Sequence, residues 1–331
     1  MSEPVRFVIL GAGAIGGVVG ARLHESGHDV MLIARGAHGD AIAARGLRLE
    51  TPRERLTLEI PVAPTPAQAG IRASDVVLLC TKSQDTWGAL CAVRDAALSA
   101  GIRVPVACLQ NGIDNERMAL RLFNEVLGAV VMVPAAHLEP GVVLAYGGNL
   151  AGSIDVGSFP SGTGALCEQV SAALASSRFD STPRADIMRF KNAKLVNNLG
   201  NAVQAVCGAG DDTEELARRL QEEGRAVLHA AGLECEAGDV SDVRGRWERW
   251  GVGEIAGRPR GGGSTWQSVA RGAGSVETDF LNGEIVLRAR LHGMPAPLNR
   301  LLQELATETV RDGHPPGWLP AADVLARAER S

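Results

Sequence analysis

The chain has few of the features that mark secreted, metal-binding or nucleic-acid-binding proteins. Its six cysteines show no CxxC spacing and its seven histidines show no metal-ligand pairing, so we expect neither a disulfide framework nor a metal site. The net charge is −5 and no extended basic tract is present, which argues against nucleic acid and anionic membranes as partners. We expect the thiols to be small buried groups in a reducing, cytoplasmic compartment. The cysteines are Cys80, Cys91, Cys108, Cys167, Cys207 and Cys235.

Long apolar runs are also missing. The apolar stretch at residues 5–10 is followed at once by glycines and has no basic leader, so we expect neither a signal peptide nor a membrane segment. The composition, 45% hydrophobic and 21% charged, is typical of a soluble globular protein. With 331 residues the chain is long enough for two domains that each bury a core.

The sequence Gly-Ala-Gly-Ala-Ile-Gly lies between an expected buried strand, residues 5–10, and a helical stretch that reaches about residue 25. Its spacing alone is weak evidence in a chain with 40 glycines, but residues 29–34 read as a second strand, which completes a βαβ unit. Such a loop lets the backbone approach a pyrophosphate at a helix N-terminus. We therefore predict that a dinucleotide is bound by Gly11, Ala12, Gly13, Ala14, Ile15 and Gly16.

The end of the second expected strand distinguishes the two nicotinamide cofactors. NAD-selecting folds usually place a carboxylate there for the ribose hydroxyls, whereas the 2′-phosphate of NADP favours a cation. This chain has Arg35 at that position and no carboxylate beside it. The guanidinium is a planar, permanently charged group that suits a phosphate, so the sequence favours NADP (NADPH) over a solvated loop arginine.

The first half of the chain alternates expected strands and helices and predicts a mostly parallel, doubly wound α/β sheet of the Rossmann type. Further strands are expected at 47–50, 56–62, 75–80, 104–109, 128–134, 142–146 and 153–156, and helices at 37–45, 86–100, 115–123 (with Asp114 as cap) and 165–176. From residue 185 the periodicity is helical and strand signals disappear. We therefore predict a cofactor domain at 1–180 and an all-α substrate domain at 181–331.

Four polar or phosphate-compatible features follow expected strand ends. They are the glycine loop, Arg35, Lys82 and Asn111. Ligands of doubly wound sheets bind beyond the carboxyl ends of the strands, so these features are expected to share one crevice. Taken singly, Lys82 reads as a surface charge and Asn111 as part of a common turn dipeptide.

A polar helix is expected at the start of the second domain. At 100° per residue, Lys194, Asn198 and Asn201 would form a stripe on one face. The stripe is either a solvated or hydrogen-bonded packing face or a set of groups for an oxygen-rich substrate. Reduction of a ketone needs a proton donor, and a desolvated lysine has a lowered pKa that suits this role. Lys191 projects into the same sector, so periodicity leaves both lysines open.

Two later stretches carry candidate residues. Ser264 precedes Gln267 by three residues, which is the capping-box pattern of a helix start and also compatible with holding a substrate carboxylate. Glu277 is expected in the first turn of a helix that ends near 292–293. There it suits the helix dipole, or it could orient an ammonium group and the substrate.

Together these motifs resemble the 2-dehydropantoate 2-reductase (ketopantoate reductase) family over nearly the whole chain. The resemblance rests on the glycine loop, Lys82, Gln110-Asn111-Gly112, Lys194–Asn198, Ser264-Thr-Trp-Gln267, and Glu277-Thr-Asp-Phe-Leu-Asn282-Gly283 with His292-Gly293, Pro297 and Asn299. It implies NADPH-dependent reduction of ketopantoate to pantoate in pantothenate synthesis, with Lys194 as general acid and Glu277 as its partner. Asn198 and Ser264 would hold substrate oxygens, Arg35 the 2′-phosphate, and Lys82 and Asn111 the cofactor side of the crevice.

The chain departs from the family pattern at one point of this helix. The family spaces its lysine and two asparagines by four and four, whereas Lys194, Asn198 and Asn201 are spaced by four and three. This leaves the role of Asn201, as a further substrate ligand, and the identity of the 2-oxo acid open. The rival functions are an opine-type or 3-hydroxy acid dehydrogenase and a non-catalytic, NADP-binding redox sensor. Monomer and homodimer are both compatible with the resemblance.

Overall fold

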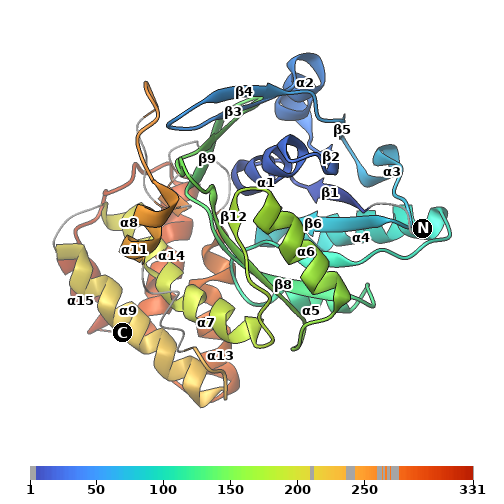
Figure 1. Cartoon of the computed structure of the whole chain (residues 1–331). Coiled ribbons are helices and arrows are strands. Elements are labelled where there is room, and N and C mark those ends of the chain that lie inside the picture. Colours follow the sequence, from blue (N-terminus) through green and yellow to red (C-terminus); the bar gives the residue numbers. More distant parts are fainter. Residues whose placement is uncertain are drawn as a thin grey trace. The chain divides into compact units, whose positions relative to one another are not determined.

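The structure, a computed structural model, describes residues 5–208, 212–235, 243–258, 263, 265–266, 269 and 276–330 (Figure 1). Two compact units divide the chain. Unit 1 comprises Met1–Gln110, Asp114–Met188 and Asp242–Pro259, and unit 2 comprises Asn111–Ile113, Arg189–Ser241 and Arg260–Ser331. These units are not divided by a single boundary in the sequence, because residues 111–113 group with unit 2 and residues 242–259 with unit 1. The domain limits 1–180 and 181–331 stay a prediction.

Unit 1 is built on an eight-stranded sheet in the order β12-β11-β8-β7-β6-β1-β2-β5. Neighbouring strands are parallel except for the antiparallel pair of β8 and β11. The strands are β1 (Arg6–Leu10), β2 (Asp29–Ile33), β5 (Val62–Ala63), β6 (Asp75–Leu79), β7 (Val106–Cys108), β8 (Val126–Met132), β11 (Gly152–Ser158) and β12 (Phe179–Asp180). The predicted doubly wound α/β sheet is confirmed.

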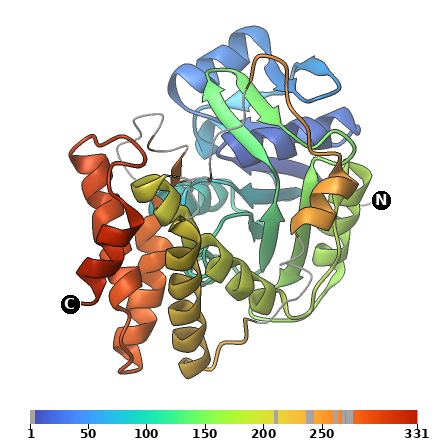
Figure 2. The ribbon, with the colours of Figure 1, turned by 90° about the vertical axis from the view of Figure 1, so that its left-hand side faces the viewer.

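Helices cover both faces of this sheet (Figures 1 and 2). In β1 the side chains alternate, so that Phe7 and Ile9 join the core with α1 and α6, while Val8 and Leu10 join the core with α3, α4 and α5. The helices of unit 1 are α1 (Ala14–Glu25), α2 (Gly36–Arg45), α3 (Pro66–Ala69), α4 (Thr86–Ser99), α5 (Asn115–Leu120) and α6 (Ala165–Ser176), with the 3-10 turn η1 (Ser83–Asp85). Asp114 precedes α5 as predicted but makes no side-chain capping bond.

A second sheet, in the order β4-β3-β10-β9, was missed by the sequence reasoning. Its strands are β3 (Leu47–Glu50), β4 (Arg55–Leu58), β9 (Ala135–Glu139) and β10 (Val142–Ala145). The single strand expected at 56–62 is wrong, because β4 joins this sheet whereas β5 joins the main one. The carbonyl of Pro61, just before β5, accepts a bond of 2.8 Å from the backbone N–H of Leu32 in β2.

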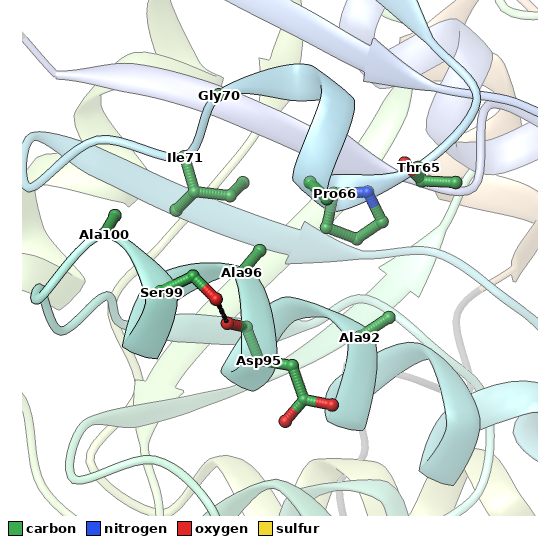
Figure 3. A pocket seen from close by; sticks show the side chains of 10 residues that line it. Thr65, Pro66, Gly70, Ile71, Ala92, Asp95, Ala96, Ser99 and Ala100 are labelled. Atoms are coloured by element: carbon green, nitrogen blue, oxygen red, sulfur yellow. Dashed lines mark hydrogen bonds between the residues drawn. The ribbon is translucent and has the colours of Figure 1, made fainter.

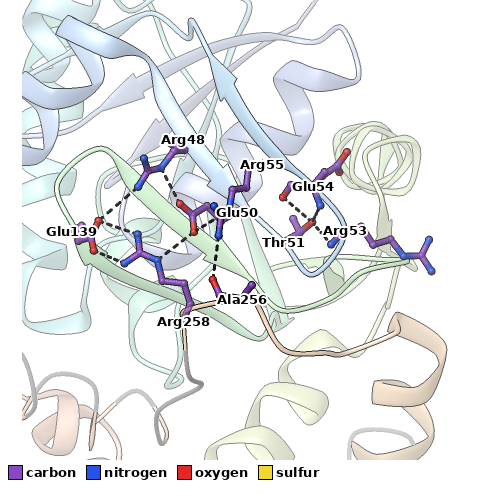
Figure 4. Close-up of polar contacts among 9 residues, drawn as sticks. All are labelled: Arg48, Glu50, Thr51, Arg53, Glu54, Arg55, Glu139, Ala256 and Arg258. Carbon is purple, nitrogen blue, oxygen red and sulfur yellow. Dashed lines mark hydrogen bonds and ion pairs between the residues drawn. The ribbon is translucent and has the colours of Figure 1, made fainter.

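Residues 243–258 belong to unit 1 although they lie between stretches of unit 2 in the chain. Helix α11 (Val243–Trp250) places Arg246 Nη1 3.0 Å from Ser153 Oγ and buries the Trp250 side chain. Arg258 then pairs with the buried Glu50 at 3.3 Å and with Glu139 (Figure 4). Ion pairs to β3 and β9 therefore fix this segment to the second sheet.

In the described part of unit 2 the regular elements are helices, which confirms the predicted all-α class. They are α7 (Ile187–Asn198), which begins in unit 1, α8 (Gly200–Cys207), α9 (Asp212–Ala230), α13 (Asn282–Leu291), α14 (Pro297–Arg311) and α15 (Ala321–Ala328), with the 3-10 turn η2 (Glu277–Phe280). Helix α9 packs against α8, α13, α14 and α15 (Figure 2). Among the described residues, no helix is long and apolar enough to cross a membrane.

Candidate functional site

The glycine loop between β1 and α1 uses its three glycines for different reasons. Gly11 has a φ of +99°, and a Cβ there would lie 3.1 Å from the main-chain nitrogen of Thr81. At Gly16 a Cβ would lie only 2.1 Å from the carbonyl oxygen of Gly11, so the glycine allows α1 to approach β1 closely. At Gly13 a Cβ would meet nothing within 4 Å. A tight turn, an open approach and close helix packing are the requirements of a pyrophosphate loop.

The N-terminus of helix α1, which starts in this loop, has features that favour the binding of an anion. Gly13 is the N-cap of α1 and offers no side-chain acceptor, and the first turn holds no acidic residue. Ala14 and Ile15 form that first turn and are half-buried, while Ala12 is buried beneath it. The unbonded amide groups of a helix start and the positive end of its dipole favour a phosphate here.

Arg35 and Lys82 each follow a strand that pairs with β1. Arg35 is exposed, comes after β2 and is the N-cap of α2. Lys82 is half-buried, comes after β6 and is the N-cap of η1. Because β6, β1 and β2 are adjacent and parallel, both residues lie at the carboxyl ends of the strands, on the side of the sheet where the glycine loop follows β1.

A buried hydrogen-bond network under these loops was missed by the sequence reasoning. Gln110 Nε2 donates to the carbonyl oxygen of Thr81 at 2.8 Å and to Thr86 Oγ1 at 2.7 Å. Thr86 Oγ1 in turn donates to Asn115 Oδ1 at 2.8 Å, and Asn115 Nδ2 donates to Ser83 Oγ at 3.2 Å. The network joins the loops after β6 and β7, and so fixes the backbone on either side of Lys82. A run of polar residues directly after two buried strands was the available signal.

Asn111 follows Gln110 directly but groups with unit 2 in the division of the chain. It is half-buried and precedes Gly112, whose φ of +79° requires a glycine-like turn. The structure therefore places Asn111 where the chain passes from one unit to the other.

Helix α7 distinguishes the two lysines that periodicity left open. The Lys191 residue is only 3% exposed, whereas Lys194 and Asn198 are half-buried and therefore reachable from solvent. The Asn198 Nδ2 atom is shielded from solvent and has no hydrogen-bond partner among the described residues. A shielded amide donor of this kind suits an acceptor that a ligand supplies.

The expectation of one continuous polar helix is wrong. Helix α7 ends at Asn198, and at Leu199, between α7 and α8, the backbone N–H bonds to the carbonyl three residues earlier, that of Val196, at 3.3 Å. The buried Asn282 holds this break by donating from Nδ2 to the Leu199 carbonyl at 3.4 Å and to Asn299 Oδ1 at 3.0 Å. Asn282 and Asn299, two residues of the motif on which the family resemblance rests, thus have a packing role that their spacing in the sequence did not reveal.

Asn201 lies on α8, beyond the break. Its Oδ1 atom would be 2.7 Å from a Cβ at Gly263, and Gly263 N donates to Gln204 Oε1 at 2.9 Å. Gly263 therefore lies against α8. Ser264 and Gln267, with their expected capping box, lie outside the described residues.

Glu277 is half-buried and opens the 3-10 turn η2. The long helix expected from this residue is wrong, since Leu281 separates η2 from α13. Next to it, the Thr278 Oγ1 atom is buried without a hydrogen-bond partner in the described part of the chain. Glu277 therefore belongs to a short 3-10 turn that is separate from α13 rather than to the start of that helix.

Two other features of the described structure do not coincide with these residues. A cavity of about 500 Å³ lies between α3 and α4 and is lined mainly by small side chains (Figure 3). Its lining includes none of the predicted site residues. The side chains of Glu308, Asp312 and His314 could offer ligand atoms within 4.8 Å of one another, but Asp312 pairs with Arg311 and His314 stacks on Trp318. Neither feature supports a metal or cofactor assignment.

The sheet, the open glycine loop and the helical second unit define the class of Rossmann-type, nicotinamide-dependent oxidoreductases. Sequence models of "Ketopantoate reductase PanE/ApbA" and of its C-terminal domain match residues 7–161 and 186–309. The chain belongs to this family of oxidoreductases, which act on CH–OH groups. It is 31% identical over 309 residues to the 2-dehydropantoate 2-reductase of Pyrococcus horikoshii, covering 91% of this chain and 96% of that one.

Solved structures agree with this family. A PanE/ApbA family ketopantoate reductase from Ralstonia eutropha JMP134 superimposes with a TM-score of 0.77 and 31% identity, covering 93% of this chain and 99% of that one. A ternary structure of D-mandelate dehydrogenase with NADH and anilino(oxo)acetate has the same TM-score of 0.77 at 21% identity, with 93% and 99% covered. The second likeness concerns the fold alone.

Proposed function

We propose that this protein reduces 2-dehydropantoate (ketopantoate) to pantoate with NADPH as hydride donor, in the synthesis of pantothenate. The observation that carries the proposal is the glycine loop, in which a side chain is excluded at Gly16 and Gly11 but space is left at Gly13. The family relationship over nearly the whole chain supports the substrate. When bound, the nicotinamide supplies a hydride to the keto carbon.

The residues at the sheet edge fit the dinucleotide. The backbone at Gly13 and the first turn of α1 would hold the pyrophosphate, and Lys82 would approach the cofactor from the loop after β6. Arg35 is exposed at the N-cap of α2, where its guanidinium could form two parallel bonds with a 2′-phosphate. This arginine is our reason to propose NADPH rather than NADH.

The residues of unit 2 would bind and protonate the substrate. Lys194 Nζ would donate a proton to the oxygen of the developing alkoxide, and Glu277 would hold the ammonium in place. Asn198, with its unpartnered amide nitrogen among the described residues, would donate to a substrate oxygen, as would Asn201 and Ser264. Asn111 would position the substrate or the nicotinamide end of the cofactor. We assign the acid to Lys194 and not Lys191, because Lys191 is almost completely buried.

Replacement of the proposed acid tests this assignment. We expect Lys194→Ala to lose most of kcat, by a factor of about a hundred to ten thousand, while the Kd for NADPH stays within about twofold. Asn197→Ala, on an exposed position of the same helix, serves as the matched control and should retain activity. A Lys194→Ala enzyme with a near-normal kcat would remove this residue from the mechanism.

We also propose that the protein acts in the cytoplasm and forms a homodimer. All six cysteines are free thiols, which suits a reducing compartment. Leu287 and Leu291 lie four residues apart on α13 and are 47% and 68% exposed, so two neighbouring leucine side chains of this helix are open to a partner in the single chain. Sedimentation equilibrium of the wild type and of Leu287→Ser/Leu291→Ser tests the dimer, which should dissociate in the double variant.

A further inference from the structure

A histidine of unit 1 contacts the glycine loop from outside it. His38 lies in the first half of α2, and its Nε2 atom is 2.7 Å from the carbonyl oxygen of Ala12, the second residue of the loop. The Nδ1 atom of the same ring accepts a bond of 2.9 Å from the backbone N–H of Gly141. Gly141 is in the turn between β9 and β10. One imidazole therefore ties the loop to the second sheet.

These two partners determine the protonation state of the ring. A backbone N–H can only donate, so His38 Nδ1 must be without a proton to accept from Gly141. A carbonyl can only accept, so Nε2 must carry the proton that it shares with Ala12. The contacts are satisfied together by the neutral Nε2–H tautomer. The protonated imidazolium would place an N–H against the N–H of Gly141.

The surroundings of the ring favour the same neutral form. Burial, and secondarily the nearby His137, hold the pKa of His38 below its ordinary value, although the bond to Ala12 opposes this. The ring of His137, on β9, is the titratable group that faces His38, with ring centroids 4.1 Å apart. The glycine loop and the β9–β10 turn contact the His38 ring through backbone atoms. The His137 Nδ1 atom is itself 3.0 Å from the carbonyl oxygen of Val142, so this pair of rings is arranged for backbone contacts rather than for a metal ion.

The carbonyl that His38 holds belongs to the same peptide group as the N–H of Gly13. In a planar trans peptide the C=O and N–H vectors point in opposite directions, so fixing the Ala12 oxygen also fixes the direction of the Gly13 N–H. A hydrogen bond to the oxygen also polarises the peptide and strengthens its N–H as a donor. Gly13 is the loop residue with open space around it.

We propose that His38 is a positioning residue for the dinucleotide, which as a neutral imidazole orients the Ala12–Gly13 peptide toward the bound pyrophosphate. The inference rests on the proposed use of a nicotinamide dinucleotide. Under this proposal, two residues at the start of α2 serve the same ligand. Arg35 at the N-cap would bind the nucleotide, and His38, three residues later, would hold the glycine loop. The role of His38 also makes dinucleotide affinity depend on pH, since protonation of the ring breaks the contact with Gly141.

Calorimetric titration with NADP⁺ of the full chain and two variants tests the inference. His38→Leu removes both bonds, and we expect its Kd to be about five- to tenfold higher than that of the wild type at pH 7.5. His38→Gln keeps a donor and an acceptor on one side chain, and we expect its Kd to lie close to that of the wild type. His28→Gln is the control, because His28 lies before β2 and contacts Ser176 instead of the loop. An unchanged Kd in His38→Leu would overturn the inference.

The pH dependence separates positioning from a general packing role. The 2′-phosphate titrates in both the wild type and His38→Gln, so the ratio of their Kd values isolates the histidine. We expect the Kd of the wild type divided by that of His38→Gln to rise about threefold or more between pH 7.5 and pH 5, because only the wild type has an imidazole to protonate at position 38. A ratio that stays flat would overturn the inference, even if His38→Leu fails to fold. A wild type that binds no nicotinamide dinucleotide would contradict the proposed function itself, whereas normal binding with no effect of the variants contradicts this inference alone.

Discussion

Two alanine substitutions in the glycine loop should have opposite consequences. In Gly16→Ala the new Cβ would lie 2.1 Å from the Gly11 carbonyl oxygen and 2.9 Å from both Ile9 Cγ2 and Cys80 Cβ. Real Cβ atoms do not approach within 3.0 Å, so α1 has to move away from the sheet. We expect a loss of about 3 kcal/mol in the free energy of unfolding. In Gly13→Ala the Cβ meets nothing within 4 Å, and stability should change by less than about 1 kcal/mol.

Dinucleotide affinity should fall in Gly13→Ala, although its stability changes little. The methyl group of Gly13→Ala occupies the space that we assign to the pyrophosphate, so its Kd for NADP⁺ should rise about ten- to a hundredfold. Urea denaturation gives the stabilities, and calorimetric titration gives the affinities. A Gly13→Ala protein that binds NADP⁺ as tightly as the wild type would refute the assignment of this space. A Gly16→Ala protein of wild-type stability would refute the packing argument.

Three further predictions concern other parts of the molecule. Asn282→Leu removes the donor to the Leu199 carbonyl and to Asn299 Oδ1, and should lower the free energy of unfolding by about 1–3 kcal/mol in urea denaturation. Asn197→Ala, at an exposed position, should change it by less than about 0.5 kcal/mol. Equal effects of the two substitutions would contradict the role of Asn282. Arg35→Gln should lower kcat/KM for NADPH about ten- to a hundredfold and leave that for NADH nearly unchanged, and a parallel loss with both cofactors would remove Arg35 from phosphate recognition. Burial raises the pKa of the Cys80 thiol to about 12, so native protein at pH 8 should resist alkylation there until it is denatured, as mass spectrometry of the labelled peptide would show; labelling at the rate of an exposed thiol would contradict this.

The first unit was predictable because its signals are local. Buried parallel strands such as Arg6–Leu10 and Asp75–Leu79 read as short apolar runs, and the glycine loop follows the first of them directly. The order of such units then requires the parallel sheet and puts Arg35 and Lys82 at one edge. These placements need no knowledge of distant contacts.

The second sheet and the segment at 243–258 depend on contacts between residues far apart in the chain. Glu50 is buried beside Arg258, more than two hundred residues later, and no local pattern of either residue indicates this pairing (Figure 4). The division of the expected strand at 56–62 has the same cause. Its two ends pair with strands of different sheets, which hydrophobic periodicity does not distinguish.

The polar stretch at 189–202 shows the limit of predicting side-chain positions in the site from helical periodicity. The 100° rule assumes one regular helix, but α7 ends at Asn198 and α8 begins at Gly200; Leu199 between them accepts a bond from Asn282 and lies close to Gly224 on α9. A Cβ at Gly224 would lie 2.5 Å from Leu199 Cδ1. Asn201 therefore lies on a different helix from Lys194 and Asn198. The roles of Lys194, Asn198, Asn201, Ser264 and Glu277 stay predictions.

The most direct test of the account is the initial rate of NADPH oxidation with ketopantoate, measured with NADH in parallel. The account predicts saturable turnover with a strong preference for NADPH, because it proposes the glycine loop for the dinucleotide, Arg35 for the 2′-phosphate and Lys194 as the proton donor to the keto acid. Absence of turnover with ketopantoate, in protein shown to bind NADPH, would contradict it.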